Sequence, residues 1–254
     1  MRRCPASSCG RPAGGGGAGR KFTGPGLRAR ALPPILRADP VQNRNPATMK
    51  LHYSPGACSL GIHVLLEEIG QPFEAVRSPI KEGALQTPEF KALNPKGKVP
   101  TLVRDDGSVL TQYTAIAFWL AASNPAAGLL PADAEGQARA LEAMDFVTGT
   151  IHPQGFSRLF NQARFAPSEA DHPKVKEQGT ALAAKGFADM DATWKGAEWV
   201  LPSGYSVADP ALFFVEFWAV KRMGMTLPPR LQAHYERMLA RPAVQRAMAT
   251  EGLA

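Results

Sequence analysis

The hydrophobic residues follow regular patterns only from Met49 onward, and the patterns change type along the chain. Runs of four or five residues rich in Val, Leu, Tyr and Phe alternate with longer runs in which hydrophobic residues recur every three or four positions. Such a mixture predicts strands alternating with helices. The expected strands are residues 50–53, 73–77, 100–104 and 108–111, and the expected helices are residues 58–69, 87–94 and 112–123.

Turn residues support these boundaries. Gly70 follows the first helix, where glycine commonly supplies the left-handed backbone that ends a helix. Thr87 followed by Pro88 is typical of a helix start. Asp105-Asp106-Gly107 joins the last two strands and predicts a hairpin turn.

After residue 132 every pattern is helical. The expected helices are residues 134–151, 156–165, 173–194, 207–223, 229–240 and 242–250. We expect His152-Pro153 to interrupt the helical pattern, because proline breaks a helix. Ser206-Val207-Ala208-Asp209 has the spacing of a capping box. We predict a mixed α/β domain at residues 49–124, a linker rich in Pro, Gly and Ala at residues 125–132, and an all-helical domain at residues 133–254.

Residues 1–48 have a different composition, rich in Gly, Pro, Ala and Arg, and no periodic hydrophobic pattern. Such a segment cannot bury enough apolar surface to offset the entropy of ordering it, so we expect disorder. Our interpretation is a mis-assigned extension that precedes a natural start at Met49. A functional leader is the alternative.

The net charge of +7 comes from that segment, which holds nine basic residues and one acid. From Met49 onward 20 basic residues face 21 acidic ones, so no basic surface for nucleic acid is implied. No apolar run reaches eighteen residues, so we expect no membrane span. Only one of the three cysteines, Cys58, lies in the patterned part, which fits a reducing compartment.

Cys58 is the first candidate for chemistry. Pro55 and Gly56 predict a turn between the first strand and the first helix, and this turn puts Cys58 at the helix N-terminus. The unpaired N–H groups and the helix dipole favour an anion there, so we expect a lowered thiol pKa.

The order of elements, with a cysteine at the start of the first helix, resembles a thioredoxin-like domain (βαβαββα). Residues 49–60 (MKLHYSPGACSL) and 94–102 (NPKGKVPTL) resemble the opening and the glutathione-binding loop of beta-class bacterial glutathione S-transferases. Residues 206–209 and 241–244 are similar to two motifs of the helical domain in the same family. The resemblance covers residues 49–254.

This resemblance implies glutathione as cosubstrate, small hydrophobic electrophiles as second substrates, a homodimer in the cytoplasm, and no metal. It implies catalytic roles for Cys58, Ser59 and His152. The implied glutathione contacts are Tyr53, Lys81, Lys98, Val99, Pro100, Gln112 and Tyr113. In the family the Val99–Pro100 bond is cis, which turns the backbone of Val99 toward the cysteinyl backbone of glutathione, as an added strand would.

Three residues depart from the family pattern. Gln112 stands where an acidic residue often holds the γ-glutamyl amine, and Tyr113 stands where a small residue is usual. The backbone N–H of Tyr113 is still expected to bind a carboxylate at the helix start. Pro153 replaces the lysine that follows the family histidine. Lys81 is also consistent with a solvated charge, and Lys98 with a plain turn residue, in place of glutathione contacts. His152 is also consistent with a helix cap or a surface residue.

Two alternatives to conjugation stay open. Cys58 has no resolving cysteine three residues on, so it would act as a monothiol in a glutathione-dependent disulfide oxidoreductase. A non-catalytic protein that binds a partner is the other alternative. The electrophile pocket is predicted to involve Phe156, Phe160 and Trp218, although aromatic residues at helical spacing also fit a core.

Overall fold

The computed structural model describes residues 48–254. Residues 1–47 of the N-terminal segment, for which we predicted disorder or a mis-assigned extension, lie outside these described residues.

A four-stranded mixed sheet forms the first part of the described chain. Its strands are β1 (Met49–Tyr53), β2 (Phe73–Arg77), β3 (Thr101–Val103) and β4 (Val109–Thr111). The order across the sheet is β2-β1-β3-β4, with β1 parallel to β2 and antiparallel to β3, and β3 antiparallel to β4. Leu51 on β1 pairs with Ala75 and Leu102 and is fully buried. This topology confirms the predicted thioredoxin-like order.

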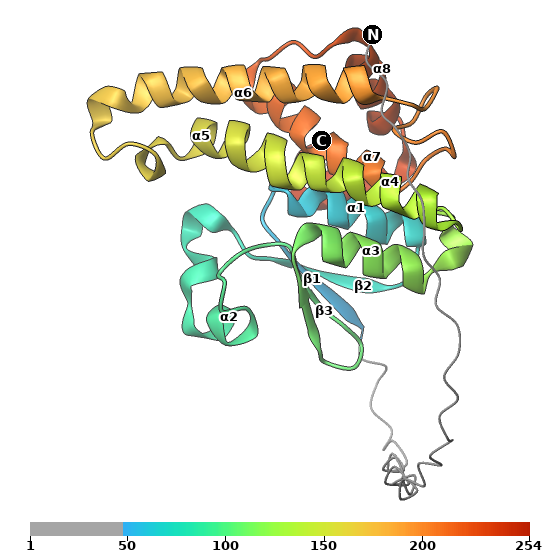
Figure 1. Cartoon of the computed structure of the whole chain (residues 1–254). Coiled ribbons are helices and arrows are strands. Elements are labelled where there is room, and N and C mark those ends of the chain that lie inside the picture. Colours follow the sequence, from blue (N-terminus) through green and yellow to red (C-terminus); the bar gives the residue numbers. More distant parts are fainter. Residues whose placement is uncertain (1–47) are drawn as a thin grey trace, which may run out of the picture. The chain divides into compact units, whose positions relative to one another are not determined.

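Helices cover the sheet on both faces. The helices α1 (Ser59–Ile69) and α3 (Tyr113–Ser123) lie side by side against one face (Figure 1). Successive side chains of a strand point to opposite faces, so His52 points away from them. There its ring meets Phe90 of the short helix α2 (Pro88–Leu93) at a centroid distance of 5.6 Å. The connections before α2 are two 3₁₀ turns, η1 (Ile80–Glu82) and η2 (Ala84–Gln86).

The rest of the described chain is helical, as predicted. Its larger elements are α4 (Ala134–Asp145), η4 (Phe146–Phe156), α5 (Ser157–Phe160), α6 (His172–Thr193), α7 (Ala208–Phe217), η7 (Trp218–Arg222), α8 (Pro229–Leu239) and α9 (Pro242–Glu251). The 3₁₀ turns between them are η3 (Pro125–Ala127), η5 (Gln162–Arg164) and η6 (Glu169–Asp171). Every residue of α7 is buried, and both α7 and α9 pack on α1. Helix α1 is therefore shared between the sheet and the helical region.

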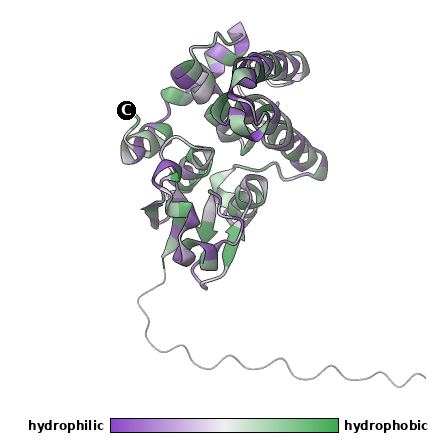
Figure 2. Ribbon diagram, turned by 90° about the vertical axis from the view of Figure 1, so that its left-hand side faces the viewer, coloured by the Kyte–Doolittle hydropathy of each residue, from purple (hydrophilic) through white to green (hydrophobic). Residues whose placement is uncertain are grey.

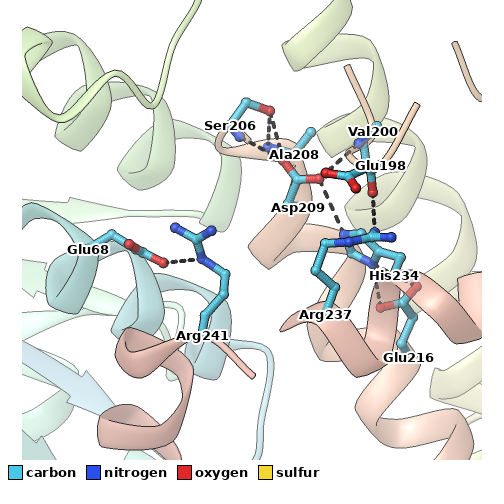
Figure 3. A network of polar contacts seen from close by, with 10 residues as sticks. All are labelled: Glu68, Glu198, Val200, Ser206, Ala208, Asp209, Glu216, His234, Arg237 and Arg241. Atoms are coloured by element: carbon cyan, nitrogen blue, oxygen red, sulfur yellow. Dashed lines mark hydrogen bonds and ion pairs between the residues drawn. The ribbon is translucent and has the colours of Figure 1, made fainter. Parts of the chain in front are cut away.

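The predicted capping box stands before α7 (Figure 3). The side chain of Asp209 accepts hydrogen bonds from the N–H of Ser206 at 2.7 Å and from the Ser206 hydroxyl at 3.2 Å. A further bond at 2.9 Å comes from the N–H of Val200. Asp209 thus fixes both the start of α7 and the segment that precedes it.

The predicted helix break at His152-Pro153 is wrong. Both residues lie inside η4, a π-helical stretch in which the N–H of Ser157 bonds to the carbonyl of His152, five residues earlier. The wider π turn accommodates Pro153, which lacks an N–H and would clash in an α-helix. The predicted helix at residues 156–165 is too long: α5 ends at Phe160, because Asn161 leaves the helical region with φ −147° and ψ 73°.

Figure 2 shows hydrophobic and hydrophilic residues interspersed along both the strands and the helices. This is the pattern of elements that bury one side. None of the helices in residues 48–254 combines the length and the apolar composition that a membrane crossing needs.

Candidate functional site

The turn between β1 and α1 presents Cys58. The N–H of Ala57 bonds to the carbonyl of Ser54 at 2.9 Å, which closes the turn, and Gly56 has the positive φ of 61° that this turn requires. Cys58 then occupies the N-cap position of α1. Its thiol lies 3.5 Å from the carbonyl oxygen of Val99 and donates to it.

The thiol of Cys58 is not activated in this state, and the expectation of a lowered pKa is wrong. Burial raises its pKa to about 12. The N–H groups of Cys58 and Ser59 and the charge of Lys98 act in the opposite direction but do not compensate. Cys58 is therefore a neutral thiol at pH 7 and can act as a hydrogen-bond donor.

The hydroxyl of Ser59 bonds to the backbone of the turn between β1 and α1. Its side chain is fully buried; its hydroxyl oxygen accepts from the N–H of Ser54 at 3.2 Å and donates to the carbonyl of Ser54 at 3.4 Å. With these two bonds the hydroxyl faces the turn, and the predicted donation from Ser59 to a glutathione sulfur stays a prediction.

Three side chains from the C-terminal helices hold the same turn, and one side chain of β1 bonds back to the last helix. The carboxylate of Glu251 accepts from the N–H of Gly56 at 2.7 Å and contacts His63 Nδ1 at 2.9 Å. Trp218 Nε1 donates to the carbonyl of Gly56 at 2.7 Å, and Arg222 donates to the carbonyl of Pro55 at 3.1 Å. Tyr53, at the end of β1, donates to the carbonyl of Thr250 at 3.4 Å. The position of Cys58 thus depends on residues near the end of the chain.

The loop before β3 supplies a free backbone group. Asn94 organises this loop by donating to the carbonyl of Lys98 and to the Thr101 hydroxyl, both at 2.8 Å. The Val99–Pro100 bond is cis, as the resemblance implied. The N–H of Val99 makes no hydrogen bond to any of residues 48–254, so it remains available to a ligand.

The start of α3 forms a second backbone site. Gln112 is exposed and has a φ of 78°, a left-handed conformation that is uncommon for a non-glycine residue. This conformation ends β4 and begins α3 within one residue, so the first N–H groups of α3 stay without intrahelical partners. Thr114, in the first turn of α3, lies 3.2 Å from the hydroxyl of Thr148 on η4.

The side chain of Tyr113 turns inward. Its ring packs against Phe214 at 5.3 Å, and its buried hydroxyl has no hydrogen-bond partner among the described residues. The hydroxyl lies so close to Gly61 of α1 that a side chain at position 61 would collide with it. Burial, and then the charge of an ionised Cys58, raise the pKa of Tyr113 well above its ordinary value.

His152 lines the same cleft as Cys58, from η4 of the helical region. Its ring contacts Trp218 at 4.8 Å and Phe214 at 5.8 Å, both edge-on. Burial, and then the charge of Lys98, lower the pKa of His152 to about 4. The imidazole is therefore neutral at pH 7 and carries one N–H donor and one acceptor.

These groups meet in one cleft of about 990 Å³ between the sheet region and η4. The predicted site residues that line it are Cys58, Lys98, Val99, Pro100, Gln112, Tyr113 and His152. Those outside its lining are Tyr53, Ser59, Lys81, Phe156, Phe160 and Trp218. Phe156 and Trp218 belong to the core, with exposures of 0% and 3%, so they form no open pocket. No group of three or more potential metal ligands occurs within residues 48–254.

Comparisons with known proteins agree with this geometry. The family model for the N-terminal domain of glutathione S-transferases matches residues 56–123. The chain is 34% identical over 208 residues to "Glutathione S-transferase GstA" of Escherichia coli O157:H7, which covers 81% of this chain and 100% of that protein.

Solved structures give the same result. A glutathione transferase homolog from Sulfitobacter, solved with bound glutathione, superimposes with a TM-score of 0.76 at 27% identity, over 82% of this chain and 100% of that one. The beta-class glutathione S-transferase of Sphingomonas chungbukensis superimposes with a TM-score of 0.69 at 32% identity, over 81% of this chain and 100% of that one.

Proposed function

The chain belongs to the glutathione S-transferase family, and from that premise we propose that it transfers the thiol of glutathione to an electrophilic carbon. The observation that carries the proposal is the meeting of Cys58, His152 and the free N–H of Val99 in one cleft. The side chains of Cys58 and His152 suit the thiol of a cysteine-containing peptide, and the N–H of Val99 suits its backbone.

We place glutathione along the loop before β3. The N–H of Val99 would pair with the cysteinyl backbone, as one strand pairs with another. The unpaired N–H groups at the start of α3, with Gln112 beside them, would bind the γ-glutamyl end. Lys98 would face the glycyl carboxylate. Lys81 lies outside the cleft, and its neighbour Ile80 lines the cleft instead, so Lys81 has no part in this proposal.

The sulfur of glutathione would then lie between Cys58 and His152. A free thiol with a pKa of about 8.5 is mostly protonated at pH 7, so donors that favour the thiolate increase the nucleophile. Cys58 is a neutral thiol that could turn its S–H from Val99 to this sulfur, and neutral His152 has one N–H to donate. The thiol proton leaves to solvent, the thiolate attacks the carbon, and the leaving group departs with its electron pair.

Disulfide reduction by Cys58 is the competing reaction. It needs the Cys58 thiolate as the attacking group. A pKa of about 12 keeps this thiol protonated at neutral pH, which argues for conjugation as the main activity.

The experiment compares the full chain with Cys58→Ser and Cys58→Ala, using glutathione with either 1-chloro-2,4-dinitrobenzene or a small mixed disulfide. We expect Cys58→Ser to retain most of the conjugation, because it keeps a donor, and Cys58→Ala to lose more. Faster disulfide reduction than conjugation, abolished in both variants, would establish the reductase instead. A folded chain that neither binds immobilised glutathione nor conjugates would favour a non-catalytic partner-binding role.

We further propose a homodimer in the cytoplasm, with an α/β domain at residues 49–124, a linker at 125–132 and a helical domain at 133–254. Helix α3 is apolar on more than its buried side: Ala115 and Phe118 are exposed or partly exposed at the edge of the cleft, and Trp119, outside the cleft lining, is partly exposed. Such a face favours association with a second copy. The free thiol of Cys58 fits a reducing compartment. Light scattering would give the mass in solution.

A further inference from the structure

The end of the cleft proposed for the γ-glutamyl group carries positive charge. Gln112, at the N-cap position of α3, makes no side-chain hydrogen bond to the helix, and the first turn of α3 holds no acidic residue. The unpaired N–H groups and the helix dipole therefore keep their positive potential there. The ammonium group of Lys96 lies next to this helix start, because it donates to the hydroxyl of Thr111, the residue before Gln112, at 2.8 Å.

No carboxylate balances this charge on the same wall of the cleft. Among the described residues, the loop before β3 and the start of α3 line the cleft with the cations Lys96 and Lys98 and with the neutral amides of Asn94 and Gln112, but with no Asp or Glu. The amide oxygen of Asn94 already accepts from the N–H of Lys96 at 3.1 Å. A ligand's ammonium group therefore meets neutral acceptors on this wall.

The acid in the cleft lining, within residues 48–254, is Asp145 at the end of α4. Its carboxylate lies against Gly149 of η4, since a side chain added at that glycine would come within 3.4 Å of it. Asp145 therefore belongs to the helical wall of the cleft, whereas Lys96 belongs to the wall that the sheet region contributes.

This distribution of charge treats the two groups of a γ-glutamyl end differently. Its carboxylate and its ammonium are attached to the same carbon, so both come close to Lys96 when glutathione binds as proposed. The carboxylate is attracted there and the ammonium is repelled. Two unit charges about 4 Å apart in water interact by about 1 kcal/mol, which corresponds to about fivefold in a binding constant.

We propose that the cleft selects its thiol cosubstrate by carboxylate groups and disfavours the γ-glutamyl ammonium, so that a peptide thiol with an anionic end binds better than one with a zwitterionic end. This inference rests on the proposed function and makes its thiol class specific. The transfer itself is the same for both thiols. With an aryl chloride, the C–S bond forms, the C–Cl bond breaks, chloride leaves with the electron pair, and the thiol proton goes to solvent.

The test uses the full chain and two thiols, glutathione and glutaryl-Cys-Gly, in which hydrogen replaces the amine and every other group is kept. Calorimetry gives the dissociation constant of each thiol. Conjugation to 1-chloro-2,4-dinitrobenzene, corrected for the uncatalysed rates, gives kcat/KM for each. We expect glutaryl-Cys-Gly to bind about fivefold more tightly than glutathione, because the repulsion by Lys96 is removed.

Variants assign this preference to the charges named. Lys96→Gln should bring the two dissociation constants together, and Lys96→Arg should keep them apart. Gln112→Glu should reverse the preference, because a carboxylate then stands beside the ammonium. Lys91→Gln is the matched control: Lys91 is an exposed lysine of α2 outside the cleft lining, so the preference should persist in this variant.

Equal binding of the two thiols by the wild type, or tighter binding of glutathione, would overturn the inference while conjugation itself stands. A preference for glutathione that disappears in Asp145→Asn would overturn it in favour of Asp145 as the partner of the ammonium. A preference for glutaryl-Cys-Gly that is unchanged in Lys96→Gln would overturn the role of Lys96. Conjugation of neither thiol would overturn the proposed function together with the inference.

Discussion

His234 lies between two carboxylates in the interior of the helical region (Figure 3). Its Nδ1 is 2.9 Å from Glu216 Oε2, and its Nε2 is 3.3 Å from Asp209 Oδ1. All three side chains are fully buried. Burial alone would lower the pKa of His234, but the charges and hydrogen bonds of Glu216 and Asp209 outweigh it and raise the pKa to about 9. The imidazole is therefore positively charged at pH 7.

Replacement of His234 tests whether its positive charge stabilises the buried carboxylates of Glu216 and Asp209. Phenylalanine would keep the ring contacts with Trp194 and Trp199, at 5.4 and 6.0 Å, but would leave Glu216 buried without a cation. Breaking a buried ion pair in this way costs about 3–5 kcal/mol. We expect His234→Phe to lower the free energy of unfolding by that amount, which for a folded part of this size lowers Tm by roughly 6–20 °C.

The double variant Glu216→Leu with His234→Phe should recover most of the loss. An apolar pair of similar volume replaces a buried ion pair at little cost or with a gain. Asp209 does not need the histidine, because it still accepts from Val200 and from both the N–H and the hydroxyl of Ser206. The two substitutions should therefore be strongly non-additive.

The pH dependence follows from the raised pKa. A histidine with a pKa of 6.5 in the unfolded chain and about 9 in the folded one stabilises the fold fully below pH 6.5. This contribution, about 3 kcal/mol, is lost as the pH rises through 9. The double variant lacks the group and should lose less stability over that interval.

Urea unfolding of the full chain, followed by circular dichroism at pH 7 and pH 10, measures these free energies, and thermal unfolding at pH 7 measures the change in Tm. Wild-type stability at pH 7 for His234→Phe would refute the argument. A double variant as unstable as the single one would also refute it, since Glu216 would then not be the source of the loss.

Three further predictions concern the site. Tyr113→Phe should raise the free energy of unfolding by about 1 kcal/mol, because it removes a buried hydroxyl without a partner. Tyr235 lies outside the cleft lining and also has a buried hydroxyl without a partner among the described residues, so Tyr235→Phe should raise the stability by a similar amount in thermal unfolding. A loss of stability in both variants would contradict the reasoning. Gln112→Glu should lower the dissociation constant for glutathione severalfold, measured by calorimetry, by restoring a charge for the γ-glutamyl amine; an unchanged constant would remove that role. Glu251→Gln should lower kcat in the conjugation assay and change KM less, because the N–H of Gly56 loses a charged acceptor and the turn that positions Cys58 becomes less fixed. Wild-type kinetics would rule out this positioning role.

The elements of the fold could be predicted because their signals are local. The hairpin at Asp105-Asp106-Gly107, the helix start at Thr87 and the capping box at Ser206 each depend on residues within a few positions of one another. The structure confirms all three: the Thr87 side chain accepts from Phe90, and Asp209 accepts from Ser206. Where prediction failed, at Pro153, the signal was again local, but a π-helical turn that proline tolerates has no separate sequence pattern.

The chemistry of the site could be predicted only in part, because it depends on contacts between distant residues. A cysteine at a helix N-terminus usually has a lowered pKa, yet the burial of Cys58 reverses the sign, and burial is a property of the folded chain. Glu251 holds the N–H of Gly56 across 195 positions of sequence, and no pattern near either residue indicates the bond. Trp218 was expected at a substrate pocket, but its indole holds the same glycine instead. Several of the residues that line the cleft are thus visible in sequence motifs, whereas those that position the turn before α1 are visible only in the structure.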